Sequence, residues 1–100
     1  MAQKPVDVTV NPGVDIVVNS DKVKVDKNLD TIAWKSTTAN QEFGIVLPAG
    51  EPTVSCGFQG NKWVCTAGPF QNTTGGVRII KYDVTASGTP TLDPDIEVFP

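Results

Sequence analysis

The chain contains no histidine. Without histidine, a Ser-His-Asp nucleophile system cannot be assembled, and the side chain that most often serves as general acid, general base or metal ligand is missing. The glycine pair Gly75-Gly76 lacks the Gly-Lys-Ser/Thr continuation of a phosphate-binding loop, so it is interpreted as a turn or bulge. The sequence therefore predicts a protein that is not an enzyme and that carries no cofactor.

Basic residues are few and scattered. The 8 Lys and Arg are outnumbered by 11 Asp and Glu, which gives a formal net charge of −3. Lys22, Lys24 and Lys27 are interleaved with Asp21 and Asp26. Non-specific binding of nucleic acid needs a concentrated basic surface, so no nucleic-acid partner is expected. No apolar run is long enough to cross a bilayer, so no transmembrane segment is expected either.

The first five residues, 1–5, contain no hydrophobic signal core. Two interpretations remain open. The protein is cytoplasmic, or it is periplasmic or secreted in a bacterium after removal of a signal peptide. Ala2-Gln3 resembles the start of a mature chain after signal cleavage and favours export.

Short valine-rich segments separated by turn formers dominate the chain. Val6, Val8 and Val10 alternate with polar residues, which is typical of a strand with one buried face, and Asn11-Pro12-Gly13 ends that strand. Similar segments follow along the whole chain, including one long strand over 77–85, and none shows a helical period. With 100 residues and 39% hydrophobic content, the chain has room for one core. The sequence predicts a single all-β domain over 1–100, a Greek-key β-sandwich of about seven to nine strands.

Gly60-Asn61 has the composition of a two-residue hairpin loop that matches the twist of the flanking strands. The loop fixes the pairing on both sides: Gln59 with Lys62, Phe58 with Trp63, Gly57 with Val64 and Cys56 with Cys65. The cysteine pair would be a non-hydrogen-bonded pair with Cα atoms about 4.5 Å apart, close enough for a disulfide. A structural disulfide between Cys56 and Cys65 is therefore predicted for an exported protein, and two reduced thiols for a cytoplasmic one.

The alternative function for Cys56 and Cys65 is a thiol-based metal or redox site. Their spacing is not that of a Cys-x-x-Cys redox motif, and two thiolates without histidine make a poor zinc site. Asp93, Asp95 and Glu97 would share one face of an extended segment, but Asp93-Pro94 is more typical of a turn than of a catalytic or calcium site. Asn72-Thr73-Thr74 matches the glycosylation sequon.

Most aromatic side chains are expected in the core, with Trp34 and Tyr82 on facing sheets. Phe58, Trp63 and Phe70 are the candidate binding residues, as an exposed patch near the end of the hairpin. The candidate surface consists of the hairpin 56–65 and the loop 69–76. The expected function is a non-enzymatic binding or structural domain whose partner is an unknown protein or small ligand.

Residues 23–35, with their Val-Lys-Val strand, acidic turn and Ile-Ala-Trp strand, resemble the cupredoxin pattern. Phe43 stands about where the first copper-binding histidine of that family would be. Tyr82-Asp83-Val84 is similar to the strand that ends in the family's cysteine ligand, and Val84 occupies the ligand position. The loop 85–94 has neither histidine nor methionine, and 93–98 resembles the closing strand. The resemblance implies a cupredoxin-like sandwich without copper, because that centre needs two histidines and a thiolate.

Overall fold

The computed structural model describes residues 2–100, and all regular structure in this range is β-strand. Because the range contains no helix, it contains none that could span a membrane. Eleven strands follow one another along residues 2–100: β1 Gln3–Asn11, β2 Asp15–Val18, β3 Lys22–Asp26, β4 Thr31–Ser36, β5 Gly44–Val46, β6 Ser55–Gln59, β7 Lys62–Ala67, β8 Arg78–Lys81, β9 Asp83–Ala86, β10 Thr89–Leu92 and β11 Asp95–Phe99.

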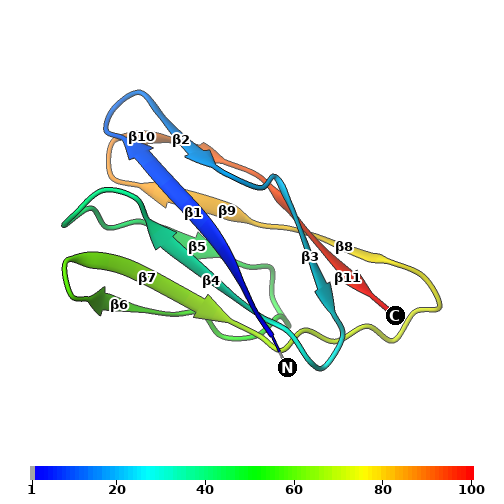
Figure 1. The fold of residues 1–100 in the computed structure, drawn as a ribbon. Helices are drawn as coiled ribbons and strands as arrows, with labels where there is room; N and C mark the ends of the chain where they lie inside the picture. The colour runs from blue at the N-terminus through cyan, green and yellow to red at the C-terminus, as the bar shows by residue number, and fades with distance from the viewer. Residues whose placement is uncertain (1) are drawn as a thin grey trace.

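Five strands form one layer in the order β2-β1-β4-β7-β6 (Figure 1). β1 and β4 run parallel, and the other neighbours in this sheet are antiparallel. The predicted alternation in β1 is confirmed, because Val6, Val8 and Val10 are all buried between exposed or half-buried neighbours. The inner face of this sheet therefore supplies one side of the core.

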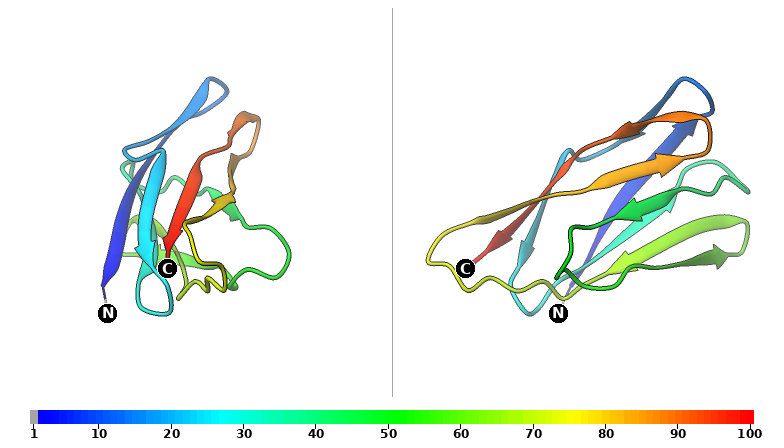
Figure 2. Two further views of the ribbon diagram at one scale, coloured as in Figure 1. Left: turned by 90° about the vertical axis from the view of Figure 1, so that its right-hand side faces the viewer. Right: turned by 180° about the vertical axis from the view of Figure 1, so that it is seen from behind.

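The second layer consists of two three-stranded sheets, β3-β11-β8 and β10-β9-β5, that meet end to end. β8 leads directly into β9, and β10 leads into β11, so two segments of the chain pass from one sheet into the other (Figure 2). Between the sheets, the backbone N–H of Tyr82 donates to the carbonyl oxygen of Pro94 at 3.1 Å. The result is an all-β, sandwich-like fold in which two layers enclose one core.

The expected single strand over 77–85 is divided at Tyr82, and this raises the strand number above the seven to nine that were expected. Ile80, Tyr82 and Val84 are all buried, so the side-chain alternation continues through the break. What changes is the partner of the backbone, from β11 on one side of Tyr82 to β5 and β10 on the other. The segment 89–92, expected as loop, forms the further strand β10.

The largest buried side chains, Trp34 and Tyr82, meet across the core. Trp34 projects from β4, and its Nε1–H donates to the hydroxyl oxygen of Tyr82 at 3.0 Å. Their ring centroids are 5.4 Å apart. The expected placement in the core is confirmed for both aromatics, although Tyr82 lies between β8 and β9 rather than within a sheet. The bond gives the buried indole N–H an acceptor, and within residues 2–100 no buried side-chain nitrogen or oxygen lacks a hydrogen-bond partner.

Tyr82 is the single tyrosine of the chain, so its ionisation can be measured directly. Burial raises the pKa of its phenol from the usual 10.0 to about 12, although the hydrogen bond from Trp34 acts in the opposite direction. At a pH between these two pKa values, the Tyr82 phenol is deprotonated in the unfolded chain and protonated in the folded chain. The free energy of unfolding should therefore fall as pH rises from about 10 to about 12, by about 1.4 kcal/mol per pH unit.

The measurement is the ultraviolet absorbance of tyrosinate against pH, in buffer and in denaturant. We expect a midpoint near 12 for the native protein and near 10 for the unfolded chain. A native midpoint near 10 would show that Tyr82 is not enclosed as described.

Candidate functional site

The hairpin β6–β7 has the register that the sequence predicts. Gln59 pairs with Lys62, Phe58 with Trp63, Gly57 with Val64 and Cys56 with Cys65, so the loop is Gly60-Asn61. Gly60 has a φ of 64°, a conformation that glycine adopts without steric cost.

The two cysteines are joined across this hairpin. Their Cα atoms are 4.0 Å apart, and their sulfur atoms are 2.06 Å apart, as in a disulfide. Cys65 is fully buried in the core, whereas Cys56 is exposed on the edge strand. The disulfide therefore links an edge strand to a strand that is packed in the interior.

Phe58 and Trp63 form an aromatic pair on the same face as the disulfide. Their ring centroids are 4.9 Å apart with an edge-to-face angle of 74°. Trp63 is half-buried, and its Nε1–H donates to the carbonyl oxygen of Phe43 at 2.8 Å. Phe58 has no such cover and remains 48% exposed. The Phe58 ring therefore faces solvent and packs against the Trp63 indole, whose position is fixed by its hydrogen bond.

The end of the hairpin is also attached to the loop that precedes β5. The backbone N–H of Asn40 donates to the carbonyl oxygen of Asn61 at 2.7 Å. The Nζ of Lys62 donates to the carbonyl oxygen of Thr37 at 2.8 Å. With the disulfide at one end and these bonds at the other, the hairpin is restrained along its length.

Phe70 does not belong to the exposed patch, and that expectation is corrected. Its side chain is fully buried, and its carbonyl oxygen accepts a hydrogen bond from the N–H of Asn28 at 2.7 Å. β7 carries the chain away from the hairpin loop, so Phe70 follows the opposite end of that strand. Hairpin spacing fixed the positions of Phe58 and Trp63, but it could not fix the path of the chain beyond β7.

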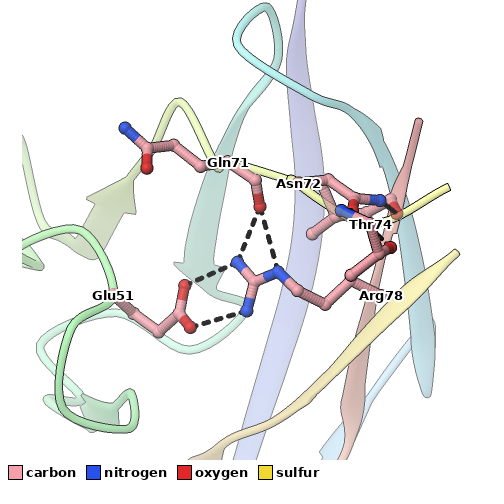
Figure 3. Close-up of polar contacts among 6 residues, drawn as sticks. Glu51, Gln71, Asn72, Thr74 and Arg78 are labelled. Carbon is pink, nitrogen blue, oxygen red and sulfur yellow. Dashed lines mark hydrogen bonds and ion pairs between the residues drawn. The ribbon is translucent and has the colours of Figure 1, made fainter. Parts of the chain in front are cut away.

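The loop 69–77 is held by an arginine clasp (Figure 3). The guanidinium of Arg78 makes two hydrogen bonds to the Glu51 carboxylate, at 2.7 and 2.9 Å. Its Nε and Nη2 also donate to the carbonyl oxygen of Gln71, at 3.0 and 2.8 Å. The hydrogen bond that Arg78 donates to the Glu51 carboxylate raises the pKa of Arg78. Glu51 and Arg78 also line an open hollow beside this loop. Their charges are therefore paired with each other rather than open to an anionic ligand.

Asn72, the first residue of the sequon, is a buried structural residue. Its Nδ2 donates to the carbonyl oxygens of Gly76 and Val98, both at 2.8 Å. Its Oδ1 accepts from the backbone N–H and the hydroxyl of Thr74, at 2.9 and 2.7 Å. The nitrogen that a glycan would modify is thus engaged between the loop and β11.

The carboxylates near the last strand pair with a lysine. Lys81 Nζ lies 2.8 Å from an oxygen of Asp95 and 4.0 Å from one of Asp93. The hydrogen bond to Asp95 raises the pKa of Lys81. Across residues 2–100 no three His, Cys, Asp or Glu side chains are grouped so as to hold a metal ion.

Phe43 and Val84, the two positions that the cupredoxin resemblance aligns with copper ligands, are both buried in the core. Phe43 borders an open hollow between the β1–β2 turn and the β9–β10 turn, whose rim includes Glu42, Thr85 and Thr89. Sequence reasoning did not find this hollow, because its walls come from three segments that are far apart in the chain.

Comparison with known proteins finds similarity in structure and none in sequence. No family model matches the sequence, and no curated protein matches it. The chain is similar to part of a Bacteroides ovatus GH5 xyloglucanase solved in complex with a XXXG heptasaccharide, with a TM-score of 0.59 and 15% sequence identity. The similarity covers 79% of this chain and 17% of that chain. At this identity the similarity concerns the fold alone.

The disulfide should contribute to stability in a measurable way. It closes a short loop, with a sequence separation of 9, and so restricts the unfolded chain. We expect the double variant Cys56→Ala/Cys65→Ala to lower the free energy of unfolding by about 2 to 3 kcal/mol in urea denaturation. Adding a reductant should lower the stability of the wild-type protein and leave the variant unchanged. Equal stability with and without reductant in the wild type would contradict a closed disulfide.

Asn72→Ala should destabilise the protein, because the carbonyl oxygens of Gly76 and Val98 lose their donor. We expect the free energy of unfolding to fall by about 2 kcal/mol or more in urea denaturation. The neighbouring Gln71→Ala is the control, since Gln71 is exposed and contributes only its backbone carbonyl to the clasp. Equal effects of the two substitutions would show that the Asn72 hydrogen bonds add nothing.

Proposed function

We propose that this chain is a non-enzymatic β-sandwich domain that serves as a binding or structural module. We further propose that its sandwich is of the Greek-key, cupredoxin-like type without copper, as residues 23–35 and 82–98 suggest by resemblance. Its contact surface is the hairpin surface, defined as β6 with Phe58, Trp63 and the Cys56–Cys65 disulfide.

The observation that carries this proposal is the exposure of Phe58 on a restrained hairpin. A phenylalanine that is 48% exposed leaves apolar area in water that burial against a partner would remove. Because the disulfide and the Trp63 contact already limit the motion of the hairpin, little conformational freedom is lost on binding. A rigid scaffold that presents an aromatic side chain at its margin is typical of recognition surfaces.

The structural similarity is in keeping with a module. The similar region is only 17% of the xyloglucanase chain, so a fold of this kind occurs there as a minor part of a longer polypeptide. The disulfide is compatible with a location outside the cytoplasm, where such bonds persist. We therefore propose a periplasmic or secreted protein.

The alternative, a thiol-based metal or redox site, is not proposed. Cys65 is fully buried, and within residues 2–100 no further cysteine, histidine or carboxylate joins the two sulfur atoms to complete a ligand set. A reactive thiol pair needs access and a charged environment that lowers the thiol pKa.

The test is site-specific photo-crosslinking in the cells that produce the protein. Phe58 is replaced by p-benzoylphenylalanine, and the same replacement at Val14 serves as control. Val14 is 69% exposed and lies beside β2, at the opposite edge of the five-stranded sheet from β6. We expect position 58 to give a discrete adduct with one polypeptide, identified by mass spectrometry, and position 14 to give none. No adduct at position 58 above the level at position 14 would contradict the hairpin surface as a contact site.

A further inference from the structure

We propose that the outer edge of β6 pairs with β6 of a second copy of this chain, antiparallel, about a two-fold axis at Gly57. This inference rests on the proposed function, because it uses the same hairpin surface. It adds the identity of the partner and the register of the contact.

The backbone of β6 has hydrogen-bonding groups directed away from β7. In an antiparallel pair, hydrogen-bonded and non-hydrogen-bonded residue pairs alternate. Gln59 and Lys62 close the two-residue loop, so their pair is hydrogen-bonded, and the pairs of Phe58 and Cys56 are not. The N–H and C=O groups of Cys56 and Phe58 therefore point outward. β6 is the last strand of its sheet, and no backbone hydrogen bond from elsewhere in 2–100 reaches these groups.

The composition of β6 leaves this edge open. Monomeric β-proteins protect their sheet edges with charge, proline, covering segments or very short strands. Every other edge strand formed by residues 2–100 has one of these features: β2 has Asp15 and lies against β10, β3 has Lys22 and Lys24, β8 has Arg78 and Lys81, β10 has Pro90, and β5 is only three residues long. β6, with Ser55, Cys56, Gly57, Phe58 and Gln59, has neither charge nor proline.

The sequence of β6 is suited to pairing with itself. With the axis at Gly57, Cys56 of each copy faces the partner's Phe58, and each of these two pairs exchanges two N–H···O bonds. Four intermolecular backbone hydrogen bonds result. The partner's Gly57 faces Gly57 in the close, non-hydrogen-bonded pair, with Cα atoms about 4.5 Å apart. Glycine puts no side chain into this narrow gap, and no heavy atom lies within 4 Å of the Cβ position at Gly57.

The same register covers the exposed aromatic ring. Residues directly opposite each other project to the same face, so Phe58 would pack on the partner's Cys56 at its disulfide. Contacts of sulfur with aromatic rings are favourable. Because β6 has no charged residue, the net charge of −3 is not concentrated at the contact. The two five-stranded sheets would join into one continuous sheet.

The contact is short, so the association should be weak. A five-residue edge buries less than the roughly 1,200 Å² of a stable protein–protein interface. We therefore expect a monomer–dimer equilibrium in the range of about 10 µM to 1 mM protein.

Sedimentation equilibrium of the purified chain over about 10 µM to 1 mM tests this equilibrium directly. We expect the wild type to pass from monomer to dimer. Gly57→Lys should weaken dimerisation at least about tenfold, because it puts two lysine side chains of like charge opposite each other at the axis, on Cα atoms about 4.5 Å apart. Gly75→Lys is the matched control, with the same change of charge in the loop 69–77. Neither glycine has a positive φ or an atom near its Cβ position, so both variants should fold, as melting curves would verify.

A monomer at every concentration would overturn the inference, and so would a dimer that Gly57→Lys leaves as tight as Gly75→Lys does. The crosslinking experiment separates this failure from failure of the proposed function. An adduct from position 58 to a different polypeptide, with no dimer, refutes pairing between copies and leaves the hairpin surface as a contact site. No adduct and no dimer refute both.

Discussion

The contact between Trp34 and Tyr82 is the constraint on which the two layers depend. Trp34 belongs to the five-stranded sheet, and Tyr82 lies where the chain passes from β8 to β9. Their hydrogen bond is a direct polar link between two side chains inside a core that consists largely of apolar residues. Because Tyr82 is also tied through its backbone to Pro94, the position at which the second layer changes partners is fixed relative to the first layer.

The two ends of β7 are stabilised by different means. At one end the polar groups are used up in contacts within the protein, and at the other end backbone groups stay exposed. Beyond one end, the Arg78–Glu51 clasp and the buried Asn72 use their polar groups on the protein itself. At the other end, the hairpin is restrained by a disulfide and by bonds to the preceding loop, yet its edge strand remains open. Rigidity and exposure therefore coincide at β6, which is why the contact surface is proposed there.

The hairpin was the part of the candidate site that could be predicted from the sequence. A two-residue loop leaves one register, and the register determined that Cys56 faces Cys65 and that Phe58 faces Trp63. Phe70 was misplaced because its position depends on a chain path that no local pattern encodes. The role of Asn72 was missed for the same reason, since its partner Val98 is distant in the sequence.

The sequence by itself determined the all-β class, the alternation of buried valines and the hairpin register, because each follows from backbone geometry over a few residues. Only the tertiary structure decided that the segment 77–85 is divided at Tyr82, that 89–92 is a strand, and which edges are covered. Those features depend on which strand lies beside which. Buried and exposed side chains continue to alternate where a strand changes its neighbouring strand, so the sequence pattern does not reveal the change.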